Sequence, residues 1–361
     1  MSQQGVSNHG QATVIHDDGI DPRPVAADGR VPSEASRLAS HVSLTGKELA
    51  QRVGNFSLFI VLGLVVVTFW AATPRFLTLQ NWQNLALTQA VDTLMTLGVL
   101  LPLATGEFDL SVGYLIGFDA MLGAFLGEHG FSSPVIILIM LVAGALAGIV
   151  NGVLTVYFHI SSFIVTLGVG IVLSGVTEGI SGGSVIFNGI PKVISDIGLN
   201  TFGGLAISVW LAIVIAILLF YVLEHTPVGR WWYAIGGSER VVYMAGINTG
   251  LLKVAAFGGT GILVGIAAVF ALGQQGSANP GFGPDLLLPA YAAAFLGVTT
   301  WRAGFYNVIG SIVAIVVVAA GFNGLSILGV PFWVEPIFDG GVLIVAVMVA
   351  RREARHVKVG G

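Results

Sequence analysis

The sequence predicts an all-α integral membrane protein with about ten transmembrane helices. Its 361 residues are 55% hydrophobic and only 9% charged, whereas a soluble domain carries about 25% charged residues. Apolar runs of roughly 17–25 residues recur along the chain, which is the length that a helix needs to cross a bilayer. The 50 glycines suit close helix packing in lipid, and the absence of cysteine excludes disulfides and thiolate chemistry.

The chain begins with a polar segment that differs from everything after it. Residues 1–52 contain Pro and Gly, show no apolar periodicity and predict a disordered cytoplasmic tail. They lack a basic start followed at once by an apolar core, so the first apolar run, 56–72, is expected to remain as a span. We therefore expect a tail over 1–52 and a membrane domain over 53–361.

Ten apolar ranges are candidate spans, and basic residues orient them. The ranges are 56–72, 83–102, 112–128, 134–157, 161–180, 203–223, 253–273, 288–300, 307–322 and 332–350. With both termini in the cytoplasm, only Arg75 and Lys192 of the 15 Lys and Arg residues fall outside. This bias follows the positive-inside rule and predicts cytoplasmic termini.

Several small or acidic residues stand inside these predicted spans. Gly144, Gly148 and Gly152 repeat the small-residue spacing that brings two helices close together, so they predict packing. Asp92 follows Thr88 on one polar stripe of the second span, and Asp119 lies within the third. A carboxylate in a span is a hypothesis for a translocation pathway, and the alternative is interhelical hydrogen bonding.

The stretch TGEFDLSVGY, residues 105–114, places charge between two apolar spans. Asp109 or Ser111 is expected to cap the third span, because acceptors at a helix N-terminus satisfy free N–H groups and the dipole. Such a break is compatible with lipid if it is buried in protein or lines a cavity. Glu107 has no capping role, so we predict that it faces the pathway or its inner gate, where Asp109 and Ser111 are further candidates.

The longest inner loop, 224–252, holds a predicted short helix. Gly236 and Gly237 precede Ser238 in an N-cap position, Glu239 falls in the first turn, and Gly246 stands where the helix would stop. Such a helix outside the bilayer suits docking of a soluble partner, and the alternative is a mere connection between spans. The chain has no GxxxxGK[ST] motif, so it has no ATP-binding loop of that type.

Three stretches resemble the ribose-type permeases of ATP-binding-cassette importers. GRWWYAIGGSERVVYMAGIN is similar to the family's cytoplasmic coupling segment, G-R-x-x-Y-A-x-G-G-N-E-x-A-A-x-x-x-G-I, with Ser238 in place of Asn. TGEFDLSVG is similar to G-G-I-D-L-S-V-G, with Glu107 in place of Gly. AAFLGVTTWRAGFYNVIGSIV and GFNGLSILGVPFWV resemble a third region, where Pro289 replaces the usual acidic residue. The resemblance covers about residues 55–350.

This resemblance implies the membrane permease of a monosaccharide importer in the bacterial inner membrane. Two copies would form a homodimer, a cassette ATPase would use ATP and Mg, and a periplasmic sugar-binding protein would deliver the solute. The chain itself would hold no cofactor or metal and bind no nucleic acid. The residues that match or lie within the ATPase-coupling segment are Arg230, Gly236, Gly237, Ser238, Glu239, Arg240 and Gly246.

Two other classes of function are weighed against this one. An ion-coupled secondary transporter of a small polar solute would use Asp92, Glu107 or Asp109 as a proton carrier, and inverted repeats would support it; the sequence shows no convincing repeat. An intramembrane enzyme would need a catalytic pair, but the seven His form no HExxH pattern and no nucleophile–base pair is evident. We therefore expect a transport subunit rather than an enzyme.

Overall fold

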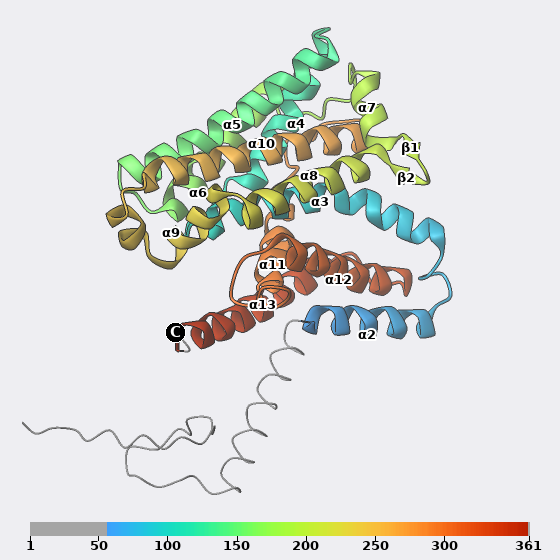
Figure 1. The fold of residues 1–361 in the computed structure, drawn as a ribbon. Coiled ribbons are helices and arrows are strands. Elements are labelled where there is room, and N and C mark those ends of the chain that lie inside the picture. The colour runs from blue at the N-terminus through green and yellow to red at the C-terminus, as the bar shows by residue number, and fades with distance from the viewer. Residues whose placement is uncertain (1–55, 360–361) are drawn as a thin grey trace, which may run out of the picture. The chain divides into compact units, whose positions relative to one another are not determined.

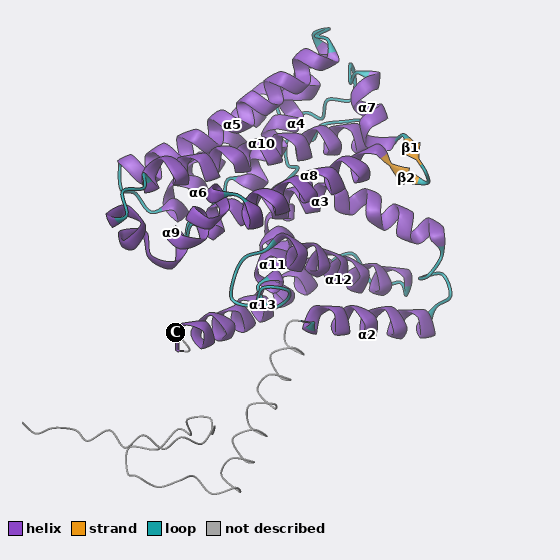
Figure 2. Cartoon of the chain, in the orientation of Figure 1, coloured by secondary structure: helices purple, strands orange, loops and turns teal. Residues whose placement is uncertain are grey.

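The computed structural model describes the backbone of residues 56–359 and the side chains of residues 56–350. The predicted tail and the basic side chains beyond residue 350 lie outside this part. The described chain is almost entirely helical (Figures 1 and 2). Its α-helices are α2 (Ser57–Ala72), α3 (Leu79–Ala104), α4 (Val112–Glu128), α5 (Ser133–Tyr157), α6 (Ser162–Ser181), α7 (Lys192–Leu199), α8 (Ile207–His225), α9 (Pro227–Met244), α10 (Thr249–Gln275), α11 (Leu287–Gly297), α12 (Val308–Ile327) and α13 (Val334–Val359).

The remaining regular structure is small. Strands β1 (Thr201–Phe202) and β2 (Leu205–Ala206) pair antiparallel as a hairpin between α7 and α8. A single 3₁₀ turn, η1 (Pro284–Leu286), leads into α11.

The all-helical membrane architecture predicted from composition is confirmed, but the count of ten spans is not. Each of the ten predicted ranges contains a helix. Within the described residues, however, only six helices are both long and apolar enough to cross a membrane: α3, α5, α6, α8, α10 and α12. Ser57–Ala72 and Pro284–Gly297 form shorter apolar helices. Apolar composition locates helices well, but it does not require that each helix be as long as the bilayer is thick.

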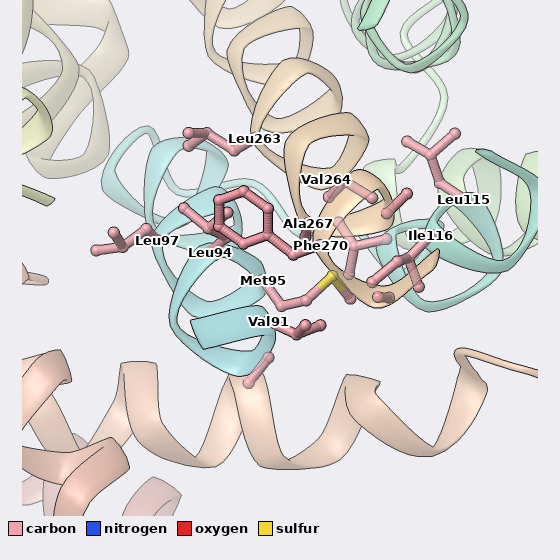
Figure 3. Close-up of a cluster of buried hydrophobic side chains, with 14 of the residues drawn as sticks. Val91, Leu94, Met95, Leu97, Leu115, Ile116, Leu263, Val264, Ala267 and Phe270 are labelled. Atoms are coloured by element: carbon pink, nitrogen blue, oxygen red, sulfur yellow. The ribbon is translucent and has the colours of Figure 1, made fainter. Parts of the chain in front are cut away.

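The core lies where α10 packs against α3, α4 and α5. Leu94 and Met95 of α3, Ile116 of α4, and Val264 and Phe270 of α10 are almost completely buried there (Figure 3). Helices buried on all sides are expected in the centre of a membrane bundle, because their surfaces meet other helices instead of lipid.

Small residues bring α5 and α10 into close contact, as the sequence predicts. A Cβ atom at Gly144 or Gly148 would collide with the backbone carbonyl of Gly261 or Phe257 on α10, and one at Gly152 would meet Val254. In lipid, helix association depends on such close packing, because the tails around a helix are as apolar as its side chains. The predicted packing role of the three glycines is confirmed.

A second group of helices contains α2, α11, α12 and α13 (Figure 1). Helix α12 contacts α2 and α11, α11 contacts α13, and both α11 and α12 also contact α3. The ring of Phe69 on α2 fills the space beside Gly324 of α12. Helix α3 is therefore shared by both groups, and its polar stripe faces this junction.

Candidate functional site

Helix α9 replaces most of the loop expected over 224–252. The prediction of only a short helix after Ser238 is wrong, because helical backbone already begins at Pro227. Thr226 caps this end by accepting a hydrogen bond from the N–H of Gly229 at 3.4 Å, and the buried side chains of Trp232 and Ile235 hold the first half in place. Such burial compensates the poor helix propensity of Gly236 and Gly237.

Ser238 divides α9 into two helical halves. Its backbone is extended, with φ −161° and ψ 99°, so the second half begins at Glu239 as the capping pattern suggests. The N–H of Gly246 bonds to the carbonyl of Tyr243 at 2.9 Å, and Gly246 adopts φ +80°. Glycine adopts this conformation readily, and the predicted stop at Gly246 is confirmed.

The first half of α9 is held by the loop that precedes α12. The hydroxyl of Tyr233 donates to the carbonyl of Tyr306 at 2.7 Å. The guanidinium of Arg302 lies 5.0 Å from the centre of the Tyr233 ring and 4.6 Å from that of Phe305, and it pairs with Glu224 at 3.0 Å. Burial, assisted by the charge of Glu224, raises the pKa of Tyr233 well above its ordinary value, so the hydroxyl keeps its proton and remains a donor.

The second half of α9 is held by a lysine between two glutamates. Lys253 Nζ lies 2.6 Å from Glu239 Oε2 and 2.9 Å from Glu107 Oε1. The lysine belongs to the first turns of α10. The side chains of Lys253 and Glu107 are 10% and 19% exposed, while that of Glu239 is 46% exposed. The three charges therefore join α9, α10 and the α3–α4 connection.

This pairing gives Glu107 the partner that sequence reasoning missed. Glu107 and Lys253 are separated by 146 residues, and no local spacing links them. The family resemblance offers no guide, because Glu107 stands where a glycine is usual. Partial burial would raise the pKa of Glu239, but the hydrogen bond and charge of Lys253 outweigh it and hold this pKa below the ordinary value of 4.5. Glu239 is accordingly ionised at neutral pH and binds Lys253 as a charged partner.

Backbone contact joins the same two segments. A Cβ atom at Gly236 would collide with the carbonyl oxygen of Ala104, the last residue of α3. Gly106 turns the chain just beyond with φ +86°, and its Cβ position would lie 3.8 Å from the Cα of Gly236. Gly236 of α9 is thus seated on the end of α3. The two sequence motifs that stand out separately along the chain are in direct contact.

The connection between α3 and α4 satisfies its backbone with side chains. Asp109 Oδ1 accepts from the N–H of Ser111 at 3.0 Å and from its hydroxyl at 2.5 Å. The N–H groups of Phe108 and Leu110 donate to Ser162 and Thr166 of α6, at 3.2 and 2.9 Å. A non-helical segment in a membrane protein needs such partners, because lipid supplies none.

The capping prediction for this connection is wrong for Ser111, and Asp109 bonds the residue before α4 instead of the helix itself. Helix α4 begins at Val112, and the side chain of Ser111 accepts no hydrogen bond from its first turn. The Ser111 hydroxyl instead donates to Asp109 and accepts from Asn151 Nδ2 at 2.8 Å. Asp109, which is 1% exposed, satisfies the backbone next to the helix start, so its position has a structural reason.

Asp119 lies in the packing between α4 and α5. It is completely buried, and neither carboxylate oxygen has a hydrogen-bond partner among the described residues. Its Oδ2 would be 3.0 Å from a Cβ atom at Gly144. The structure thus places it against the close-packed glycines, apart from the cluster of Glu107, Glu239 and Lys253.

The remaining candidate pathway residues line two different cavities. One, of about 900 Å³, is lined by Glu107, Glu239 and Lys253 together with the end of α5 and the α9–α10 connection. The other, of about 640 Å³, is lined by Asp92 and residues of η1, α11, α12 and α13. Glu107 and Asp92, which the sequence assigned to one pathway, therefore face different cavities. In the described residues no group of three or more His, Asp or Glu side chains is arranged to hold a metal ion.

The exposed face of α9 is suited to contact with another protein. Arg230, Ser238 and Arg240 are exposed. Val241, Tyr243 and Met244 are 60%, 70% and 69% exposed. Large apolar side chains beside charged ones on a protruding helix are typical of an interaction surface.

Sequence comparisons assign the chain to a family of transport proteins. Residues 81–347 match the family described as branched-chain amino acid transport system / permease component. Because this match covers most of the sequence, the chain belongs to that family of membrane permeases.

Individual relatives are named for the import of several different solutes. A ribose import permease protein of Escherichia coli (strain K12) is 29% identical over 300 residues, which is 82% of this chain and 93% of the relative. An L-arabinose ABC transporter permease protein of Azospirillum brasilense is 28% identical, covering 86% and 92%. An autoinducer 2 import system permease protein of Escherichia coli O9:H4 (strain HS) is 30% identical, covering 84% and 93%. No solved structure gives a significant match.

Proposed function

We propose that this chain is the transmembrane permease subunit of an ATP-binding-cassette importer that carries a monosaccharide or polyol from periplasm to cytoplasm. The observation that carries the proposal is α9, a protruding helix whose inner face is tied to the ends of α3 and α10 and whose outer face is exposed. Membership of the permease family and the names of the relatives support the same function.

The other subunits follow from this function. A cassette ATPase uses ATP and Mg and binds the outer face of α9, so hydrolysis takes place in the ATPase and the permease is not an enzyme. A periplasmic sugar-binding protein delivers the solute, and a second copy of the chain completes a homodimer. The membrane domain spans 53–361 in the bacterial inner membrane, with the coupling segment over 224–252, a cytoplasmic tail over 1–52 and both termini in the cytoplasm.

The contacts of α9 support a route by which ATPase closure reaches the membrane helices. Movement of its second half pulls on Lys253 through Glu239, and Lys253 lies at the start of α10. The same lysine holds Glu107, and Gly236 is seated on the end of α3. One displacement therefore acts on α10 and on the α3–α4 connection together. Transport switches commonly use such rigid-body shifts of packed elements between two states. We assign Glu107 to this linkage and Asp109 and Ser111 to the support of the connection.

The proposed docking face is tested by a matched pair of substitutions. Tyr243 on α9 and Phe187 in the connection between α6 and α7 are both 70% exposed. In the full-length permease co-expressed with its ATPase, Tyr243→Ala should weaken copurification of the ATPase and lower permease-stimulated ATP hydrolysis, and Phe187→Ala should change neither. Equal behaviour of the two variants would contradict the docking face.

Energy coupling is tested separately in proteoliposomes. The permease alone should accumulate no solute under an imposed proton gradient, whereas the complex with ATPase and binding protein should do so when supplied with ATP. Accumulation by the permease alone would favour an ion-coupled secondary transporter and overturn the proposal.

A further inference from the structure

Among the described residues, the cavity that contains Asp92 is lined by four carboxylates and no basic side chain. Asp92 on α3, Asp285 on η1, and Glu335 and Asp339 on α13 all line this space of about 640 Å³. No Lys, Arg or His of the described chain lies in its wall. None of the four carboxylates belongs to the ion pairs formed within the described residues. The cavity therefore holds four acidic side chains without a basic partner among the described residues.

The arrangement favours an organic cation over a metal ion. Within the described residues no three acidic side chains are close enough together to hold a metal. The volume falls within the range of about 300–1,000 Å³ that small-molecule sites occupy. Phe322 and Phe332 also line the cavity, and aromatic rings attract organic cations.

Neutral polar groups in the same wall suit a hydroxylated ligand. Thr88, Gln89, Asn323 and Ser326 contribute hydroxyl and amide groups. Thr96 lines the cavity as well; it is 0% exposed, and its hydroxyl has no hydrogen-bond partner among the described residues. A buried hydroxyl left without a partner costs free energy, so binding a polar group of a solute at this atom is favourable.

We propose that this cavity binds a small hydroxylated solute carrying a protonated amine, in the manner of an amino sugar. The carboxylates bind the ammonium group, and the amides and hydroxyls, Thr96 among them, bind the solute's hydroxyl groups. The inference rests on the proposed function and narrows its substrate class from neutral sugars and polyols to amine-bearing ones.

The absence of native cysteine makes the charge of the cavity directly measurable. The natural sequence has 0 Cys, so Ser326→Cys introduces a unique thiol in the cavity wall, and Thr201→Cys places one on the exposed β1–β2 hairpin. The full-length variants in neutral detergent are labelled with a cationic trimethylammonium-ethyl methanethiosulfonate and with its anionic sulfonatoethyl counterpart. The ratio of the two labelling rates reports the local potential at each position.

We expect the ratio of cationic to anionic labelling rates to be about tenfold higher at position 326 than at position 201. Clefts lined by charges of one sign concentrate counter-ions by such factors. Adding Asp92→Asn or Asp339→Asn should lower the ratio, and the exposed control Glu178→Gln should leave it unchanged. Equal ratios at the two positions, or no response to either cavity variant, would overturn the proposal.

Protection by ligand tests the substrate class. D-glucosamine should slow labelling of Ser326→Cys by the uncharged methyl methanethiosulfonate at concentrations where D-glucose does not. Equal protection by both sugars, or by neither, would overturn the amine preference. That failure would leave the importer function intact if ATP-dependent uptake still requires the exposed face of α9, so the two proposals fail separately.

Discussion

Two groups of charged side chains in the described part of this mostly apolar chain differ in whether the protein neutralises them. At the end of α3, Glu107 and Glu239 share Lys253 at hydrogen-bond distance. In the cavity between α3, α12 and α13, Asp92, Glu335 and Asp339 lie without a basic partner among the described residues. The paired cluster joins three segments of backbone. The unpaired cluster joins nothing, so its charge is available to a ligand.

This difference separates a structural use of charge from a recognition use. An ion pair in a weakly solvated place adds modest stability, yet removing one partner leaves a charge that the site cannot solvate. A cavity lined by carboxylates without a counter-ion avoids the cost of an unsolvated charge only while water or a ligand fills it. Substitutions in the two clusters should therefore have different effects. Those in the paired cluster should lower stability and coupling, and those in the unpaired cluster should weaken solute binding.

The largest effect is expected at Lys253. Lys253→Met removes the cation shared by two glutamates and should destabilise the protein by about 2 kcal/mol, less than for a fully buried pair because Glu239 is half-exposed. Unfolding in mixed micelles measures the loss, and ATPase stimulation should fall with it. The exposed Lys192→Met on α7 serves as the control. Adding Glu107→Gln to Lys253→Met should recover part of the stability; no recovery would mean that the two residues are not coupled.

The next effect separates two neighbouring glycines. A Cβ atom at Gly236 would collide with the Ala104 carbonyl, whereas nothing lies within 4 Å of a Cβ at Gly237. Gly236→Ala should therefore cost about 1–2 kcal/mol through overpacking and reduce the coupling of ATP hydrolysis to uptake. Gly237→Ala should be neutral or stabilise by up to about 1 kcal/mol through helix propensity.

The outcome is read in the same unfolding and transport assays. A loss of the same size in both glycine variants would show that α9 is not seated on the end of α3.

The sequence predicts those parts of this fold that depend on one segment at a time. Apolar runs locate the helices, the spacing of Gly144, Gly148 and Gly152 predicts close helix packing, and Gly246 marks the end of α9. Each of these features depends on local chemistry or on one face of one helix. The number of helices that cross the membrane is less accessible, because it depends on how short apolar helices pack against longer ones.

The candidate site was only partly predictable for the same reason. Asp92 and Glu239 are recognisable as polar residues in unusual places. Glu107 pairs with Lys253, and Asp92 shares a cavity with Asp339. Both arrangements depend on contacts between segments far apart in the sequence, so the spacing of residues along the chain does not predict them. The first half of α9 was missed because Gly236 and Gly237 suggest a break, whereas tertiary packing of Trp232 and Ile235 overrides that local preference.

A smaller effect tests whether Asp119 belongs to either cluster. Its carboxylate is completely buried beside Gly144 and has no described hydrogen-bond partner. Asp119→Asn replaces an uncompensated acidic group with a neutral one of the same shape and should stabilise the protein by about 1 kcal/mol. Uptake and the labelling ratio at position 326 should remain unchanged. A loss of uptake without a loss of stability would instead place Asp119 on the solute pathway.

The smallest effect is a pH dependence that belongs to the paired cluster. Because the pKa of Glu239 is held below its ordinary 4.5, the folded state binds this proton less readily than the unfolded state. The stability from its pairing with Lys253 is therefore fully present above pH 4.5 and is lost as pH falls through the lower folded pKa. For so exposed a group the contribution is below about 1 kcal/mol. Glu239→Gln should unfold at a lower temperature than the natural chain between pH 5 and 7, and the difference should shrink below pH 4.5. A gap that stays constant down to pH 3 would mean that Glu239 contributes through packing rather than through charge.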